Sequence, residues 1–117
     1  MRDVPLGLTF DDVLLVPQES AVLPSGVQVT SRLTKQIQLE VPIVAAAMDT
    51  VTTVAMAKAI AREGGIGILH RNCTIEQQVQ MVKEAKEENV LVGAAIGPHD
   101  LDRAGALDAA GADVIAV

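Results

Sequence analysis

Residues Val41–Asn72, VPIVAAAMDTVTTVAMAKAIAREGGIGILHRN, decide the fold of this chain. They begin with an apolar run, Val41–Ala47, that lacks polar alternation, as is typical of a parallel strand covered on both faces. A stretch of helical composition, Val54–Glu63, ends at Gly64-Gly65, and a second apolar strand, Ile66–Leu69, follows. We therefore predict a βαβ unit. Polar residues follow both strands, at the edge where α/β proteins place their sites.

The composition limits the class of protein. The chain has 117 residues, enough for one small domain, and Phe10 is its only aromatic residue, so the core must be aliphatic. A net charge of −6 argues against electrostatic binding to nucleic acid or to an anionic membrane surface. No run approaches about 20 apolar residues, the length that spans a bilayer. A single cysteine, Cys73, and the absence of an apolar core after Arg2-Asp3 predict a cytoplasmic protein without an intrachain disulfide.

The segment before Val41 lacks the alternation of strands and helices that is predicted after it. Residues 1–26 contain Pro17 and Pro24 and predict an extended arm that lies over a larger body. Two short stretches with partial alternation, Val27–Leu33 and Ile37–Leu39, predict a small hairpin outside the main sheet. We therefore divide the chain into an arm and hairpin, residues 1–40, and a β/α region, residues 41–117.

The β/α region contains four predicted strands and three predicted helices. Thr50 or Thr52 is expected to cap the first helix, Thr74 and Gln77 to form a capping box on the second, and Asp100 to cap the third. The strands are expected at Ile43–Ala45, Ile66–Leu69, Val90–Ile96 and Val114–Val117, and the helices at Thr53–Arg62, Ile75–Lys86 and Leu101–Ala110.

Two architectures use this alternation, a doubly wound open sheet and a (β/α)8 barrel. No Gly-x-Gly-x-x-Gly follows the first strand, which weakens the dinucleotide-fold option, and Gly93-Ala94-Ala95 suits a closely packed barrel interior. Four strands make half of a barrel, so we predict the N-terminal half of a (β/α)8 TIM barrel and expect the sequence to be truncated. Val114–Val117 would then form an apolar edge that invites pairing with another chain.

Several segments resemble the IMP dehydrogenase family, in the family's own order. They are Leu8–Pro17 (LTFDDVLLVP), Thr30–Thr34 (TSRLT), Ala46–Val51 (AAMDTV), Gly64–Asn72 (GGIGILHRN), Val92–Gly97 (VGAAIG) and Ala109–Val117 (AAGADVIAV). The resemblance implies a cytoplasmic, tetrameric (β/α)8-barrel enzyme. Such an enzyme oxidises inosine monophosphate to xanthosine monophosphate with NAD, in guanine nucleotide synthesis, and uses a potassium ion.

The chain departs from the family's pattern in two places. Most members carry a pair of CBS domains between the second helix and the third strand, whereas Lys86-Glu87-Glu88-Asn89 joins these elements directly, so the pair is expected to be absent. The family's catalytic cysteine and potassium site belong to later loops. The 117-residue chain is therefore expected to lack dehydrogenase activity by itself.

The resemblance also suggests which residues bind ligands. Ala46 and Met48 match positions near the nucleotide substrate, although composition alone would make Met48 core filler. Asn72 could line the same end of the barrel, at the carboxyl ends of the strands, or belong to a solvated loop. His99 follows the third strand, where a histidine contacts the adenosine of NAD in some relatives. We therefore predict substrate binding at Ala46, Met48 and Asn72 and cofactor binding at His99, with no catalytic or metal-binding residue.

Neighbouring polar residues have simpler explanations. Cys73 lacks the glycine-rich flanks of the family's catalytic loop, and we interpret it as structural or incidental. Asp49 and Thr50 are interpreted as caps of the first helix. His70 is interpreted as a satisfied histidine at a strand end. The acids Asp11-Asp12 are expected to tie the arm to the barrel.

Two further hypotheses stay open. GMP reductase shares the fold and the AMDTV-type strand end, although LTFDDVLLVP and GGIGILHRN favour the dehydrogenase. The other is a non-catalytic half-barrel that self-associates through its exposed strand edge, which a stable, folded monomer would count against. No nucleic acid or membrane partner is expected.

Overall fold

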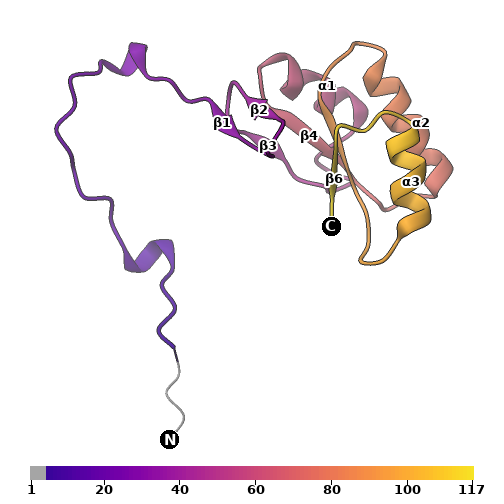
Figure 1. Ribbon diagram of the computed structural model, residues 1–117, viewed down its shortest axis with the longest axis horizontal. Coiled ribbons are helices and arrows are strands. Elements are labelled where there is room, and N and C mark those ends of the chain that lie inside the picture. The colour runs from indigo at the N-terminus through magenta and orange to yellow at the C-terminus, as the bar shows by residue number, and fades with distance from the viewer. Residues whose placement is uncertain (1–4) are drawn as a thin grey trace, which may run out of the picture.

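The computed structural model describes residues 5–117, so the expectation about Arg2-Asp3 lies outside the described residues. A parallel sheet and three helices form the body of the chain (Figure 1). The strands of this sheet are β3 (Val44–Ala45), β4 (Ile66–Leu69), β5 (Val92–Ala95) and β6 (Val114–Ala116). The helices between them are α1 (Val54–Arg62), α2 (Ile75–Lys86) and α3 (Leu101–Ala109). These bounds agree with the predicted ones to within two residues.

The strand order distinguishes the two candidate architectures. The sheet runs β3-β4-β5-β6, in the order of the sequence, and every pair is parallel. A doubly wound sheet reverses its strand order at a switch point and carries helices on both faces. Here the helices pack on one face only, as they do around a barrel. The predicted half-barrel arrangement of four strands and three helices is confirmed.

Each face of the sheet has its own core. The outer core holds strand residues together with helix residues, namely Ala57, Leu69, Val82, Ala85, Val92, Ala94, Ile96 and Leu107. The inner core lies against a hairpin and holds Leu39, Ile66, Ile68 and Ala95. Alternate residues of β4 and β5 therefore face opposite cores, which explains their uninterrupted apolar sequence.

The predicted hairpin is present with shorter strands, β1 (Ser31–Arg32) and β2 (Gln38–Leu39), paired antiparallel outside the main sheet. Leu33 and Ile37 pack with buried Leu39 against the inner face. The hairpin thus covers part of the inner face of the sheet.

Glycines permit the close packing that the sequence predicted. A Cβ on Gly67 would lie 2.6 Å from the Cα of Ala57, so α1 rests directly on β4. A Cβ on Gly93 would collide with the side chain of Ile68, because the two residues are paired across β4 and β5 on the inner face. Small residues in these strands therefore set the spacing between layers.

The cap of α1 differs from the prediction. Thr53, and neither Thr50 nor Thr52, is the N-cap, and its hydroxyl accepts a hydrogen bond from the amide of Met56. Thr52 is fully buried and donates its hydroxyl proton to the carbonyl oxygen of Ala46. The hydroxyl of Thr52 therefore closes the loop after β3 by joining the end of this loop to its beginning.

The other helix ends agree with the sequence. Thr74 and Gln77 form the predicted capping box on α2, with side-chain to backbone distances of 3.0 and 3.2 Å. Asp100 caps α3 by accepting a hydrogen bond from the amide of Arg103 at 3.3 Å. Gly111 follows α3 with φ +95°, the left-handed conformation that ends helices.

The N-terminal arm is extended, as predicted, apart from two short 3₁₀ turns, Phe10–Asp12 and Pro24–Gly26. It runs away from the sheet of this chain (Figure 1), and its contact with a larger body stays a prediction. Phe10 is 98% exposed. Asp12 accepts hydrogen bonds from the amide and hydroxyl of Thr9, so it shapes a local turn rather than tying the arm to the sheet.

The connection between α2 and β5 is short. Asn89 takes a left-handed conformation there, with φ 54°. Lys86 donates to the carbonyl oxygen of Val90 at 3.1 Å and pairs with Asp113 at 2.9 Å. Asp113 in turn accepts a hydrogen bond from the amide of Val92. These contacts fix the start of β5 beside the end of α2. Among residues 5–117, no helix has the length and apolar character to cross a membrane.

Candidate functional site

Three loops leave the carboxyl ends of adjacent strands. They comprise residues 46–53 between β3 and α1, residues 70–74 between β4 and α2, and residues 96–100 between β5 and α3. Parallel strands bring these ends to one edge of the sheet, and every predicted site residue lies on one of the loops.

The first loop holds Met48 at the surface. The amide of Met48 donates to the carbonyl oxygen of Ala46 at 2.8 Å, and the carbonyl of Met48 accepts the amide of Thr52 at 2.9 Å. These bonds form a tight turn, and the side chain of Met48 remains 53% exposed. Met48 therefore belongs to neither core of this chain. An exposed, polarizable thioether on a braced turn is suited to packing against a flat ring.

Asn72 lies on the second loop and joins it to the first. Its Nδ2 donates to Oδ2 of Asp49 at 2.7 Å. This hydrogen bond lowers the pKa of the Asp49 carboxyl below its ordinary value, because it favours the ionised form. Asp49 thus contacts a neighbouring loop and does not cap α1, contrary to the sequence interpretation. Asn72 is an exposed residue whose amide orientation is fixed by that contact.

His99 lies on the third loop in an uncommon conformation. Its φ of 65° places a non-glycine residue in the left-handed region, and its side chain is exposed. Such a conformation costs about 1–3 kcal/mol and is found frequently at ligand-binding positions. The imidazole ring is thus presented to solvent at the carboxyl end of β5, where an aromatic base could stack on it.

Arg71 connects the second loop to the third. A Cβ on Gly97 would lie 3.1 Å from Nη1 of Arg71, so the guanidinium group passes directly over this glycine. Together with the Asn72–Asp49 hydrogen bond, this contact forms a continuous chain of neighbours from the first loop to the third. Neither contact could be read from the spacing of the residues in the sequence.

A buried polar network lies beneath the loops and was not predicted. Gln78 is fully buried at the start of α2 and forms hydrogen bonds with the ends of β4 and β5 and with Arg103. One signal was present in the sequence: Gln78 lies three residues after Ile75 and four before Val82, on the apolar face of α2.

His70 and Cys73 do not form a reactive pair. Nδ1 of His70 is buried without a hydrogen-bond partner among residues 5–117, so its interpretation as a satisfied histidine is wrong for that atom. Sγ of Cys73 is 3.8 Å from the carbonyl oxygen of His70. In the part of the chain that the structure describes, no three His, Cys, Asp or Glu side chains gather as metal ligands.

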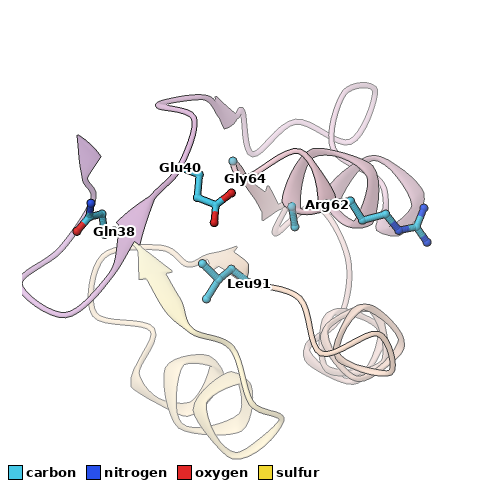
Figure 2. Close-up of a pocket in the computed structure, with 7 residues that line it drawn as sticks. Gln38, Glu40, Arg62, Gly64 and Leu91 are labelled. Atoms are coloured by element: carbon cyan, nitrogen blue, oxygen red, sulfur yellow. The ribbon is translucent and has the colours of Figure 1, made fainter. Parts of the chain in front are cut away.

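A cavity of about 290 Å³ lies at the opposite edge of the sheet, beside the residues that precede β4 and β5 (Figure 2). Its lining includes Gln38, Glu40, Gly64 and Leu91. The guanidinium group of Arg62 points away from this space and pairs with Glu88. The cavity is separated from the three loops by the length of the strands, and none of the predicted site residues lines it.

Comparisons with known proteins agree with the sequence motifs. A family model described as "IMP dehydrogenase / GMP reductase domain" matches residues 7–117. The chain is 62% identical over 86 residues to inosine-5'-monophosphate dehydrogenase of Aquifex aeolicus, covering 74% of this chain and 18% of that protein. It is 56% identical over 80 residues to the Bacillus subtilis enzyme of the same name, covering 68% and 16%. The chain thus spans less than a fifth of the length of these relatives.

Proposed function

This chain belongs to the IMP dehydrogenase / GMP reductase family, and we propose that it forms the first part of a catalytic barrel that oxidises inosine monophosphate with NAD. The observation that carries the proposal is the family match across residues 7–117, supported by relatives named inosine-5'-monophosphate dehydrogenase. The reaction converts inosine monophosphate, NAD⁺ and water to xanthosine monophosphate, NADH and a proton.

Each of the three loops has a proposed role. Ala46 and Met48 contact the purine of the substrate, because the exposed thioether and the small neighbouring side chain leave room for a flat ring. Asn72, oriented by Asp49, offers a carbonyl oxygen for a further hydrogen bond with the substrate. His99 stacks on the adenine of NAD. The bound NAD supplies the hydride acceptor, and these residues position the two ligands.

The reacting groups are proposed to lie outside this chain. Cys73 is the only cysteine, and its thiol lies next to the carbonyl oxygen of His70 without a glycine-rich loop around it. We therefore assign the covalent purine adduct and the potassium site to other parts of the barrel. The chain by itself is expected to form no NADH from inosine monophosphate and NAD. A cytoplasmic, tetrameric enzyme of guanine nucleotide synthesis without CBS domains is proposed for the whole protein.

A chimera tests this proposal. Residues 7–117 replace the N-terminal part of the barrel of the Aquifex aeolicus enzyme, to which 86 residues of this chain align, and NADH formation is measured at varied concentrations of inosine monophosphate and NAD. Met48→Ala is expected to raise KM for inosine monophosphate, and His99→Ala is expected to raise KM for NAD. Met56→Ala, a 43% exposed methionine on α1, is the matched control and is expected to change neither. The GMP reductase alternative is decided by the rest of the barrel, which holds the reacting groups, and a folded chimera that forms no NADH would count against our proposal.

The non-catalytic alternative is also tested. A self-associating half-barrel predicts that the purified 117-residue chain sediments as a dimer and that the chimera is inactive although folded. Our proposal expects an active chimera, whatever the association state of the isolated chain.

A further inference from the structure

Gln78 joins the ends of two neighbouring strands. Its Nε2 donates to the carbonyl oxygen of Leu69 at 3.4 Å and to that of Ala95 at 2.9 Å. Leu69 is the last residue of β4 and Ala95 the last of β5, so one amide group spans both carboxyl ends. The side chain is fully buried, and its Oε1 accepts a hydrogen bond from Nη1 of Arg103 at 2.7 Å.

Arg103 extends this connection to two loops. Its Nη2 donates to the carbonyl oxygen of Cys73 at 3.1 Å, on the loop after β4. Its Nε donates to Oδ2 of Asp100 at 3.0 Å, on the loop after β5. Only 13% of the Arg103 side chain is exposed. A guanidinium group suits this position because its donors point in fixed, divergent directions within one plane.

The two loop contacts fall beside the proposed ligand contacts. Cys73 directly follows Asn72, and Asp100 directly follows His99. We infer that Arg103, held by its hydrogen bond to Gln78, is a positioning residue. It sets the distance between the loop of residues 70–74, which holds Asn72, and the loop of residues 96–100, which holds His99. As far as ligands are concerned, this inference rests on the proposed function. The coupling of the two loops is a property of the chain alone.

Amide hydrogen exchange tests the coupling without any ligand. The reporting amides are those of Gln77 and Gln78, just after the loop of residues 70–74, and those of Asp100 and Ala104, at and just after the end of the loop of residues 96–100. Arg103→Met keeps an unbranched side chain that reaches as far as Nε of arginine and removes all the donors. It is expected to speed exchange at both pairs of amides about tenfold, as for the loss of a buried hydrogen-bonded contact.

Two further variants make the exchange result decisive. Arg62→Met is the matched control, because Arg62 pairs with Glu88 at the exposed end of α1, and it is expected to leave all four amides unchanged. Arg103→Lys is expected to exchange faster than the wild type at Gln77 and Gln78, since one ammonium group cannot reach three separate acceptors, and it carries the test if Arg103→Met fails to fold. Faster exchange confined to Asp100 and Ala104 would mean that Arg103 stabilises only the start of α3, and this result would overturn the inference. So would unchanged rates in both Arg103 variants.

Kinetics in the chimera test the consequence for ligands. Arg103→Met is expected to raise KM for both inosine monophosphate and NAD by about threefold or more, because both loops shift relative to each other. A purely structural role would lower the amount of active enzyme, and hence apparent kcat, with both KM values unchanged, and that result would overturn the positioning role. A chimera without dehydrogenase activity would refute the proposed function, whereas the exchange rates would still decide whether Arg103 couples the loops.

Discussion

Gly67→Ala is the substitution that most sharply tests how α1 is placed against β4. The added Cβ would lie 2.6 Å from the Cα and 2.8 Å from the Cβ of Ala57, and 3.2 Å from Cγ2 of Thr52. Carbon atoms in contact are normally about 3.5–4.0 Å apart, so the helix or the strand must move by roughly 1 Å. Both neighbours are fully buried, and the closest one belongs to the helix backbone, which cannot rotate away.

The expected loss of stability follows from these distances. Inserting a methylene-sized group into a packed core costs about 1–3 kcal/mol, and a clash with backbone belongs at the upper end of that range. Burying one more methyl group returns at most about 0.8 kcal/mol. We therefore expect Gly67→Ala to lower the free energy of unfolding by about 2 kcal/mol. Because Thr52 closes the first loop, the Asp49–Asn72 hydrogen bond should weaken as well.

Gly105→Ala is the matched control. Gly105 lies within α3, and a Cβ there would meet no atom within 4 Å, so helix propensity alone should stabilise the chain by about 0.5–1 kcal/mol. Urea unfolding followed by circular dichroism at 222 nm is the suitable assay, because the chain has no Trp or Tyr. A Gly67→Ala variant as stable as the wild type would refute the close packing of α1 on β4.

Two further predictions follow from single contacts. Thr53→Ala should destabilise the chain by about 1 kcal/mol in the same unfolding assay, whereas Thr50→Ala should have little effect, because Thr53 is the cap; equal losses would contradict this assignment. Carbon-detected NMR titration should show the pKa of Asp49 below the ordinary value of an aspartate, and Asn72→Ala should raise it toward that value. Folding lowers the pKa of Asp49, so the ionised carboxyl stabilises the folded chain at pH values above the pKa of Asp49 in the unfolded chain. This stabilisation is lost as the pH falls through the pKa of Asp49 in the folded chain. An unchanged Asp49 titration in the variant would argue against the hydrogen bond.

The regular elements were predictable because their signals are local. The apolar run of Ile66–Leu69 and the capping box of Thr74 and Gln77 each depend on residues within one turn or strand. The same holds for the stop at Gly111, which requires only a left-handed conformation. The sequential strand order was harder to predict, because alternation of strands and helices fits both parallel architectures.

The contacts that shape the site were not predictable in the same way. Asp49 was interpreted as a cap because a carboxylate after a strand and before a helix is commonly one, yet its partner is Asn72, 23 residues away. Arg103 reaches Cys73, 30 residues earlier, and no pattern in the sequence links them. Thr52 and Thr53 are adjacent threonines, and only the backbone path decides which one is buried.

The N-terminal arm shows a further limit. The arm contains large apolar residues, such as Leu14 and Leu15, whose composition suggests burial, yet each is more than 90% exposed in this chain. Composition indicates that such residues favour contact with an apolar surface, but it does not say which part of a molecule supplies that surface.

The most direct test of the account is an NMR titration of the isotope-labelled chain with inosine monophosphate and, separately, with NAD. We predict that inosine monophosphate shifts the amides of Ala46, Met48 and Asn72, and that NAD shifts the amide of His99, in a saturable manner. The amides of Glu40 and the other residues around the cavity at the opposite edge should keep their positions. Shifts confined to that cavity, or no saturable shift in any of the three loops, would contradict a nucleotide site at the carboxyl ends of the strands.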